Sequence, residues 1–194
     1  MAKKAKSTLL NMVLSLTIIA VVAAVALAAM NNATKEPIEQ AKKEKTEQAI
    51  KAVLPEYAEL QAIEINLDGE PAALKCNKAF DASGNFVGMA VESFTEKGFN
   101  GHIGVMVGFD AEGNVFGYQI LETGETPGLG SKAGDWFQKD GKGSIIGKTP
   151  GDNGFSVSKD GGDVDAITAA TISSRAFCDA INRAYKAFQK GGNE

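Results

Sequence analysis

Apolar residues are concentrated near the start of the chain, where no residue from Leu9 to Met30 carries a formal charge. A helix of this length spans the hydrocarbon core of a bilayer, so we predict a transmembrane helix over 9–30. A cleaved signal peptide is the alternative, because Ala24-Val25-Ala26 resembles a cleavage site. The apolar run is longer than a typical signal core, and this favours the uncleaved anchor.

The charges that flank this run indicate its orientation. Lys3, Lys4 and Lys6 come before it, whereas Lys35 is the first cation after it. Positive charge is retained on the cytoplasmic side of a membrane. We therefore expect residues 1–8 in the cytoplasm and the rest of the chain, beyond the helix, outside it.

Charged residues alternate with small apolar residues from Glu36 to Val53, with Pro37 near the start of the segment and Pro55 just beyond its end. This pattern predicts a solvated helix that leads away from the membrane. We expect 31–56 to be a charged connecting helix, a stalk or a lid, with the globular domain over 57–194.

Two segments share a turn signature, Asp-Ala-Ser-Gly-Asn at 81–85 and Asp-Ala-Glu-Gly-Asn at 110–114. Each lies between apolar stretches, so both predict hairpin loops. Around the second loop the apolar residues alternate, which predicts an antiparallel pair with one buried face, and a further strand is expected over 86–92. The alternating residues are Ile103, Val105, Val107 and Phe109 before the loop, and Phe116, Tyr118 and Ile120 after it.

The C-terminal part combines a long Gly-rich stretch at 122–154, a short apolar run at 155–157 and a helical pattern. Long loops in compact domains are often functional, and the short run predicts a strand. The final helix is expected to begin within a few residues of Thr171 or Ser173. The fold class is therefore α+β, an antiparallel sheet with flanking helices. The helical pattern rests on Phe177, Ile181, Ala184 and Phe188.

Composition narrows the possible functions. A chain of 194 residues suffices for one domain and an anchor. The net charge is −4 and no basic cluster follows the first residues, which argues against a nucleic-acid partner. Cys76 and Cys178 are too far apart in sequence for a zinc or iron–sulfur motif, so no metal site is predicted. A disulfide between them and two packed thiols both fit.

The first candidate motif is Asp165-Ala-Ile-Thr168-Ala169-Ala170-Thr171-Ile-Ser173-Ser174, directly before the final helix. The free N–H groups and the positive dipole end of a helix start favour a bound phosphate. The small side chains of Ala169 and Ala170 would let a phosphate approach closely. The same hydroxyls also suit a simple helix cap.

The second candidate motif is Glu125-Thr126-Pro127-Gly128-Leu129-Gly130, which follows a predicted strand. Pro and Gly favour a rigid turn, and the glycines permit close approach by a flat ligand or another backbone. By themselves these six residues also fit a bare surface loop.

Together, in this order and separated by one Gly-rich stretch, the two motifs resemble those of the FMN-binding domain family over roughly 79–188. The first resembles its attachment motif, Asp-x-x-Ser/Thr-Gly-Ala-Thr. The resemblance implies that a flavin transferase, with FAD as donor, esterifies FMN to Thr171. Asp165 and Thr168 then match recognition positions, Ala170 matches the alanine, and Ala169 replaces the usual glycine. Glu125 to Gly130 match a segment that lies along the flavin.

Within the membrane-anchored branch of this family, the chain resembles the G subunits of Rnf electron-transport complexes. This implies a non-autonomous redox subunit, with no catalytic residue of its own, in a translocase that couples electron transfer between ferredoxin and NAD to sodium or proton movement. Its partners would be the other membrane and iron–sulfur subunits. The C subunit of sodium-translocating NADH:quinone reductase is the related alternative. A flavin-free structural subunit is a rival, as is a stand-alone flavin reductase, although the chain has no Gly-x-Gly-x-x-Gly dinucleotide motif.

Four further residues are candidates around the flavin. The family often has a lysine near the flavin where Lys159 stands, although a lone lysine in a Gly- and Asp-rich loop also fits solvated surface. Ser173 lies two residues after the attachment position and is expected to help bind the cofactor. Trp136 and Phe137 would flank the ring or fill the core, and core filling is favoured. No role is assigned to His102.

Overall fold

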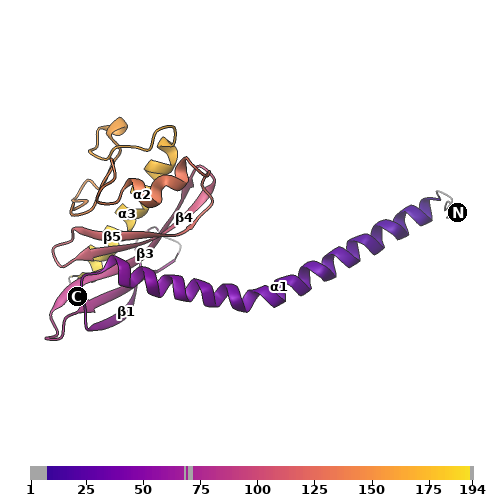
Figure 1. Cartoon of the computed structure of the whole chain (residues 1–194), viewed down its shortest axis with the longest axis horizontal. Coiled ribbons are helices and arrows are strands. Elements are labelled where there is room, and N and C mark those ends of the chain that lie inside the picture. The colour runs from indigo at the N-terminus through magenta and orange to yellow at the C-terminus, as the bar shows by residue number, and fades with distance from the viewer. Residues whose placement is uncertain (1–7, 68, 70–71, 193–194) are drawn as a thin grey trace. The chain divides into compact units, whose positions relative to one another are not determined.

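The computed structural model describes residues 8–67, 69 and 72–192, and the predicted lysine cluster at 3–6 lies outside these ranges. Figure 1 shows the order of the elements along the chain. The helices are α1 (Leu9–Val53), η1 (Gly130–Lys132), α2 (Ala133–Trp136), η2 (Ser158–Asp160) and α3 (Thr171–Gly192), where η denotes a 3₁₀ helix. The strands are β1 (Glu59–Ile65), β2 (Leu74–Phe80), β3 (Phe86–Gly98), β4 (Gly101–Asp110) and β5 (Val115–Thr123).

The chain divides into two compact units, 1–44 and 45–194. Within the first unit, α1 carries the apolar run, whose large side chains are all exposed. In the described part of the chain it is the one helix long and apolar enough to cross a membrane, with a mean hydropathy of 2.7 over an 18-residue window. Pro37 lies inside this helix rather than at the start of a separate one.

The second unit contains a five-stranded antiparallel sheet in which every strand pairs with its neighbour in sequence, in the order β1-β2-β3-β4-β5. Both predicted hairpin loops are confirmed. In each, the first aspartate accepts backbone N–H groups from residues two and four positions later, at 2.7–3.0 Å. The glycines of these loops, Gly84 and Gly113, have φ of 81° and 86°, which explains why both turns carry glycine there.

The sheet is covered on both faces. α3 packs across one face against β3 and β4 (Figure 1). The last turns of α1 pack on the other face, where Val53 meets Ala90 and Met106. Strand β4 is therefore buried on both faces, and the expectation of a single buried face is wrong. The alternating pattern does not reveal this, because Met106 lies on the face opposite to Val105 and Val107 and is covered by the last turns of α1.

Two local predictions also need correction. Phe116 is 46% exposed, and Val115 is buried in its place. A register shift between Gly108 and Phe109 pairs Phe109 with Val115, so Phe116 turns outward. The apolar run at 155–157 forms no strand; only Val157 makes an isolated parallel bridge, to Val164.

The long Gly-rich stretch folds over the end of the sheet through η1 and α2. Phe137 is fully buried and stacks on Phe177 of α3 at 4.3 Å, which confirms core filling for this residue. Tyr118 anchors α2, because its hydroxyl donates to the Ala133 carbonyl at 2.6 Å. Both cysteines are free and buried, so they are packed thiols, and burial raises the pKa of each to about 12.

Close packing of α1 on the sheet requires glycine at position 108. A Cβ atom there would overlap the carbonyl oxygen of Val53. We predict that Gly108→Ala displaces the end of α1 and lowers the free energy of unfolding by about 3 kcal/mol. Urea unfolding of the detergent-solubilised chain would measure this. The matched control is Gly134→Ala, whose added methyl meets no atom within 4 Å. Equal stability of the two variants would contradict the packing argument.

Candidate functional site

The two sequence motifs meet through one hydrogen bond. The hydroxyl of Ser173, in the first turn of α3, donates to Glu125 Oε2 at 2.6 Å. Both residues are buried, Glu125 at 7% exposure and Ser173 at 2%. A carboxylate is costly to bury unless it is hydrogen-bonded. This contact therefore fixes the loop after β5 against the start of α3.

The same carboxylate also holds the turn between β3 and β4. Asn100 donates its backbone N–H to Glu125 Oε1 at 3.3 Å, and its side-chain amide donates to the Gly124 carbonyl at 2.9 Å. Gly98 and Gly130 lie against the carboxylate so closely that a Cβ on either would overlap a carboxylate oxygen. Three separate segments thus converge on one buried side chain.

Each motif contains a tight turn of the same kind. The Leu129 N–H donates to the Thr126 carbonyl, which places Pro127 and Gly128 at the two central positions. The Ala170 N–H donates to the Ile167 carbonyl in the same way. The third residue of each turn has positive φ, 77° at Gly128 and 62° at Ala169. This is the pattern of a type II turn, in which the third position favours glycine.

Thr171 begins α3, as the sequence indicated, and its side chain has a cationic neighbour. Lys159 of η2 donates from Nζ to Thr171 Oγ1 at 3.1 Å. The first backbone N–H groups of an α-helix have no acceptor within the helix, so the positive end of the α3 dipole lies at this hydroxyl. The site combines a nucleophilic hydroxyl, an ammonium group and free amide donors.

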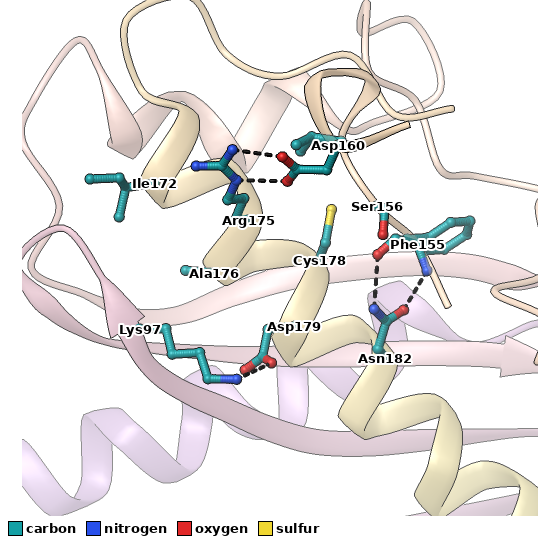
Figure 2. A pocket seen from close by; sticks show the side chains of 11 residues that line it. Lys97, Phe155, Ser156, Asp160, Ile172, Arg175, Ala176, Cys178, Asp179 and Asn182 are labelled. Atoms are coloured by element: carbon teal, nitrogen blue, oxygen red, sulfur yellow. Dashed lines mark hydrogen bonds and ion pairs between the residues drawn. The ribbon is translucent and has the colours of Figure 1, made fainter. Parts of the chain in front are cut away.

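Two contacts hold η2 in place. Ser158 donates its hydroxyl to Asp165 Oδ1 at 3.1 Å, and Arg175 of α3 binds both carboxylate oxygens of Asp160 at 2.7 Å (Figure 2). This guanidinium lowers the pKa of the Asp160 carboxyl below its usual value. Asp165 thus positions η2, and its backbone carbonyl accepts the Trp136 indole N–H at 2.8 Å.

A pocket of about 310 Å³ opens beside Thr171. Three large apolar side chains around it, Phe99, Leu129 and Ile172, are 65%, 40% and 49% exposed. The seven remaining lining residues are all candidates that the sequence motifs indicated. They are Glu125, Thr126, Gly130, Ala169, Ala170, Thr171 and Ser173.

The other sequence candidates support the pocket from outside its lining. Pro127 and Gly128 form the turn before Leu129, and Thr168 precedes Ala169 in the second turn. Asp165 holds η2 in place through Ser158, and Lys159 of η2 contacts the Thr171 hydroxyl. The structure therefore brings all thirteen candidate residues to one region, although only eight of them, Leu129 included, line the cavity.

Two residues of the pocket, Phe99 and Ile172, were not predicted from the sequence. Phe99 lies in the turn between β3 and β4, and an aromatic residue between glycines in a turn was the available signal. Ile172 lies inside the first motif, in which only the hydroxyl, aspartate and alanine positions suggested a role.

His102 pairs with Glu96, from Nδ1 to Oε1 at 2.6 Å. Among the described residues no group of His, Cys, Asp or Glu could hold a metal ion.

A second pocket of about 510 Å³ shares Ile172 with the first (Figure 2). Its charged side chains are already paired, Arg175 with Asp160 and Lys97 with Asp179 at 2.6 Å. Cys178 also lines this pocket, and burial raises the pKa of its thiol (Figure 2). Each cation of this pocket is therefore paired with a carboxylate, whereas the Lys159 ammonium contacts the neutral hydroxyl of Thr171.

Comparison with known proteins gives the site a context. Residues 98–186 match the FMN-binding domain family. The G subunit of the ion-translocating oxidoreductase complex of Methanosarcina acetivorans is 33% identical over 187 residues, covering 93% of this chain and 96% of its own. The protein of the same name in Shewanella oneidensis is 41% identical over 107 residues, 53% of this chain and 50% of its own. The crystal structure of Shewanella oneidensis NqrC is 27% identical, covers 63% of this chain and 60% of its own, and gives a TM-score of 0.48.

The left-handed backbone at Ala169 leads to a stability prediction. A side chain in this conformation costs about 1–2 kcal/mol, and glycine avoids that cost at the expense of chain entropy. We expect Ala169→Gly to raise the free energy of unfolding by about 0.5–1 kcal/mol in urea unfolding. The matched control is Ala111→Gly in the exposed hairpin loop, where φ is not positive. That change should be neutral or destabilising, and the same result at Ala169 would refute the argument.

The buried hydrogen bond between Ser173 and Glu125 leads to a second prediction. Ser173→Ala leaves a buried carboxylate oxygen without its donor, which should lower the free energy of unfolding by about 1–3 kcal/mol. Ser173→Thr retains a hydroxyl and serves as a control for the donor itself. The double variant Ser173→Ala, Glu125→Gln should recover part of the loss, because a neutral amide is less costly to leave unpaired. Full stability of Ser173→Ala alone would show that the contact contributes little.

Proposed function

The chain belongs to the family of ion-translocating oxidoreductase complex G subunits, and we propose that it carries electrons within such a membrane complex through FMN joined covalently to Thr171. One observation carries the covalent part of the proposal. The Thr171 hydroxyl lies at once at the start of α3, within hydrogen-bond distance of the Lys159 ammonium, and in the wall of the pocket built with the second motif.

The residues around the pocket fit both ends of FMN. A phosphate on Thr171 would meet the N–H groups at the start of α3 and the Lys159 ammonium, which suit an anion. Beside it, Phe99, Leu129 and Ile172 offer apolar surface of the kind that a flat aromatic ring contacts. When bound, FMN supplies a redox centre that accepts and releases electrons.

The protein's own residues then serve to bind and orient. Glu125 and Ser173 keep the two motifs at a fixed separation, and Gly130 lies so close to both that a Cβ atom would overlap them. With the flavin bound, Phe99, Leu129 and Ile172 would contact the ring and remove part of its apolar surface from water. A covalent link to Thr171 prevents loss of the cofactor and leaves the ring free, because the bond is made at the phosphate end. No residue of this chain is assigned a bond-making role toward a metabolite.

The wider activity follows from the family. We propose that the complex couples electron transfer between ferredoxin and NAD to sodium or proton translocation. The segment over 9–30 has no charged residue, so the ion path belongs to other subunits. The segment anchors the chain with its N-terminus in the cytoplasm and the flavin domain outside. The other membrane and iron–sulfur subunits are its partners, and a flavin transferase acts on it during maturation.

Two alternative functions are each disfavoured by a separate observation. The relatives described above that are more than 30% identical are both named as G subunits, which favours this assignment over the C subunit of the sodium-translocating quinone reductase. A flavin-free structural subunit would keep the same motifs as fold elements. It would have no use for a lysine directed at the Thr171 hydroxyl, and this contact favours the flavin-bearing protein.

The proposal predicts where the flavin is attached. In cells that also produce a flavin transferase, the wild-type chain should give a band on a denaturing gel that fluoresces under ultraviolet light. Thr171→Ala should remove the fluorescence completely, because no oxygen remains to be esterified. Thr171→Ser should retain it, at least in part.

The control for this experiment is Thr149→Ala, which removes an exposed threonine hydroxyl outside the pocket. Its fluorescence should equal that of the wild type. A dark wild-type band, with a known flavin-bearing protein fluorescing in the same cells, would defeat the covalent proposal and favour the flavin-free alternative.

A further inference from the structure

We propose that Lys159 is the positioning residue for flavin attachment: it holds the Thr171 oxygen for phosphoryl transfer and afterwards pairs with the phosphodiester. This inference rests on the proposed function. It assigns Lys159 to the tether, and not to the redox ring. The supporting observation is the Nζ to Oγ1 distance of 3.1 Å.

The position of Lys159 decides between these two roles. The apolar pocket that would receive the ring is lined by residues of the two motifs, with Phe99 and Ile172, and Lys159 is not among them. Its ammonium instead contacts the one atom to which the phosphate would be joined. A charge at this point acts on the phosphate and lies at the far end of the cofactor from the ring.

The backbone that carries Lys159 is fixed from both sides. On one side, the Ser158 N–H donates to the Val164 carbonyl at 2.8 Å, and the Ser158 hydroxyl donates to Asp165 of the attachment motif. On the other side, Asp160 is bound through two hydrogen bonds by Arg175, one helical turn after Thr171 (Figure 2). Ser158 therefore contacts the attachment motif, Lys159 contacts the Thr171 hydroxyl, and Asp160 contacts α3.

Arg175 cannot easily take the same role. It lies four residues after Thr171, hence on the same face of α3. Its guanidinium is, however, engaged by both carboxylate oxygens of Asp160. The Lys159 ammonium contacts a neutral hydroxyl instead, so a negative charge placed on Oγ1 gains a new charge-assisted hydrogen bond.

The chemical step can be written with its atoms balanced. With FAD as donor, Thr171 Oγ1 forms a bond to the phosphorus on the flavin side, and the bond from that phosphorus to the bridging anhydride oxygen breaks. AMP leaves with the bond electrons, and the hydroxyl proton passes to a base of the transferase. Lys159 keeps its own protons throughout. It orients the oxygen and offsets the negative charge that gathers as the phosphoryl group arrives.

The test measures the rate of attachment in the full chain. Purified transferase and FAD are added to flavin-free protein in detergent, and covalent flavin is followed by gel fluorescence and intact mass. Lys159→Gln removes the charge but keeps a hydrogen-bond donor, whereas Lys159→Arg keeps the charge. Lys142→Gln, which changes an exposed lysine in the Gly-rich stretch at 122–154 that does not line the pocket, is the matched control.

We expect Lys159→Gln to slow attachment about tenfold or more, Lys159→Arg to stay within about threefold of the wild type, and Lys142→Gln to be unchanged. The phosphorus resonance of the attached group should also shift in Lys159→Gln, a change that a purely structural role would not cause. Wild-type rates in Lys159→Gln would overturn the inference, as would equal slowing in the Arg and Gln variants.

The two proposals fail differently in this experiment. If the wild-type chain takes up no flavin, or if Thr171→Ala still does, the covalent link to Thr171 is wrong. If the wild type is labelled at Thr171 and Lys159→Gln is labelled equally fast, only the role of Lys159 is wrong. Urea unfolding of each flavin-free variant shows whether a slow rate merely reflects loss of the fold, and a stable, slow Lys159→Gln variant supports the inference.

Discussion

The buried carboxylate of Glu125 is the contact on which the pocket depends. It accepts the Ser173 hydroxyl from α3 and the Asn100 N–H from the turn between β3 and β4, while it belongs itself to the loop after β5. Because an unpaired carboxylate is costly to bury, all three segments must be in place together. The buried carboxylate also requires glycine at positions 98 and 130, since a side chain at either would collide with it. The pocket beside Thr171 lies between these three segments.

The sheet brings the three segments to one end of the domain. Gly98 pairs with Gly101 across the turn from β3 to β4, and Ile103 pairs with Thr123 close to the end of β5. The turn and the end of β5 therefore lie side by side in an antiparallel sheet. α3 starts at that same end and covers one face, while the last turns of α1 cover the other. The buried core thus fixes the framework, and the site is formed at its edge by loops.

The sequence predicted those parts in which a local pattern has one physical cause. Two aspartate-glycine turns predicted hairpins, the helical spacing predicted α3, and two motifs in order indicated the site. It could not predict parts that depend on contacts between distant segments. The exposure of Phe116 follows from a register shift, and the burial of β4 on both faces follows from the docking of α1. Phe99 belongs to the site because its turn is held by Glu125, and the motif that contains Glu125 does not indicate that its carboxylate reaches this turn.

Ala169 shows how such a framework holds a residue other than glycine in a left-handed conformation. Its left-handed φ of 62° is normally left to glycine, yet the turn around it is closed at three points. The Ala170 N–H donates to the Ile167 carbonyl, the Ile167 N–H donates to the Ser174 hydroxyl at 2.9 Å, and that hydroxyl donates to the Ala170 carbonyl at 3.0 Å. Strain persists where the surroundings determine the conformation. The methyl group therefore lowers stability and leaves the turn intact. Because the turn directly precedes α3, the same hydrogen bonds also fix the start of this helix, where Thr171 lies.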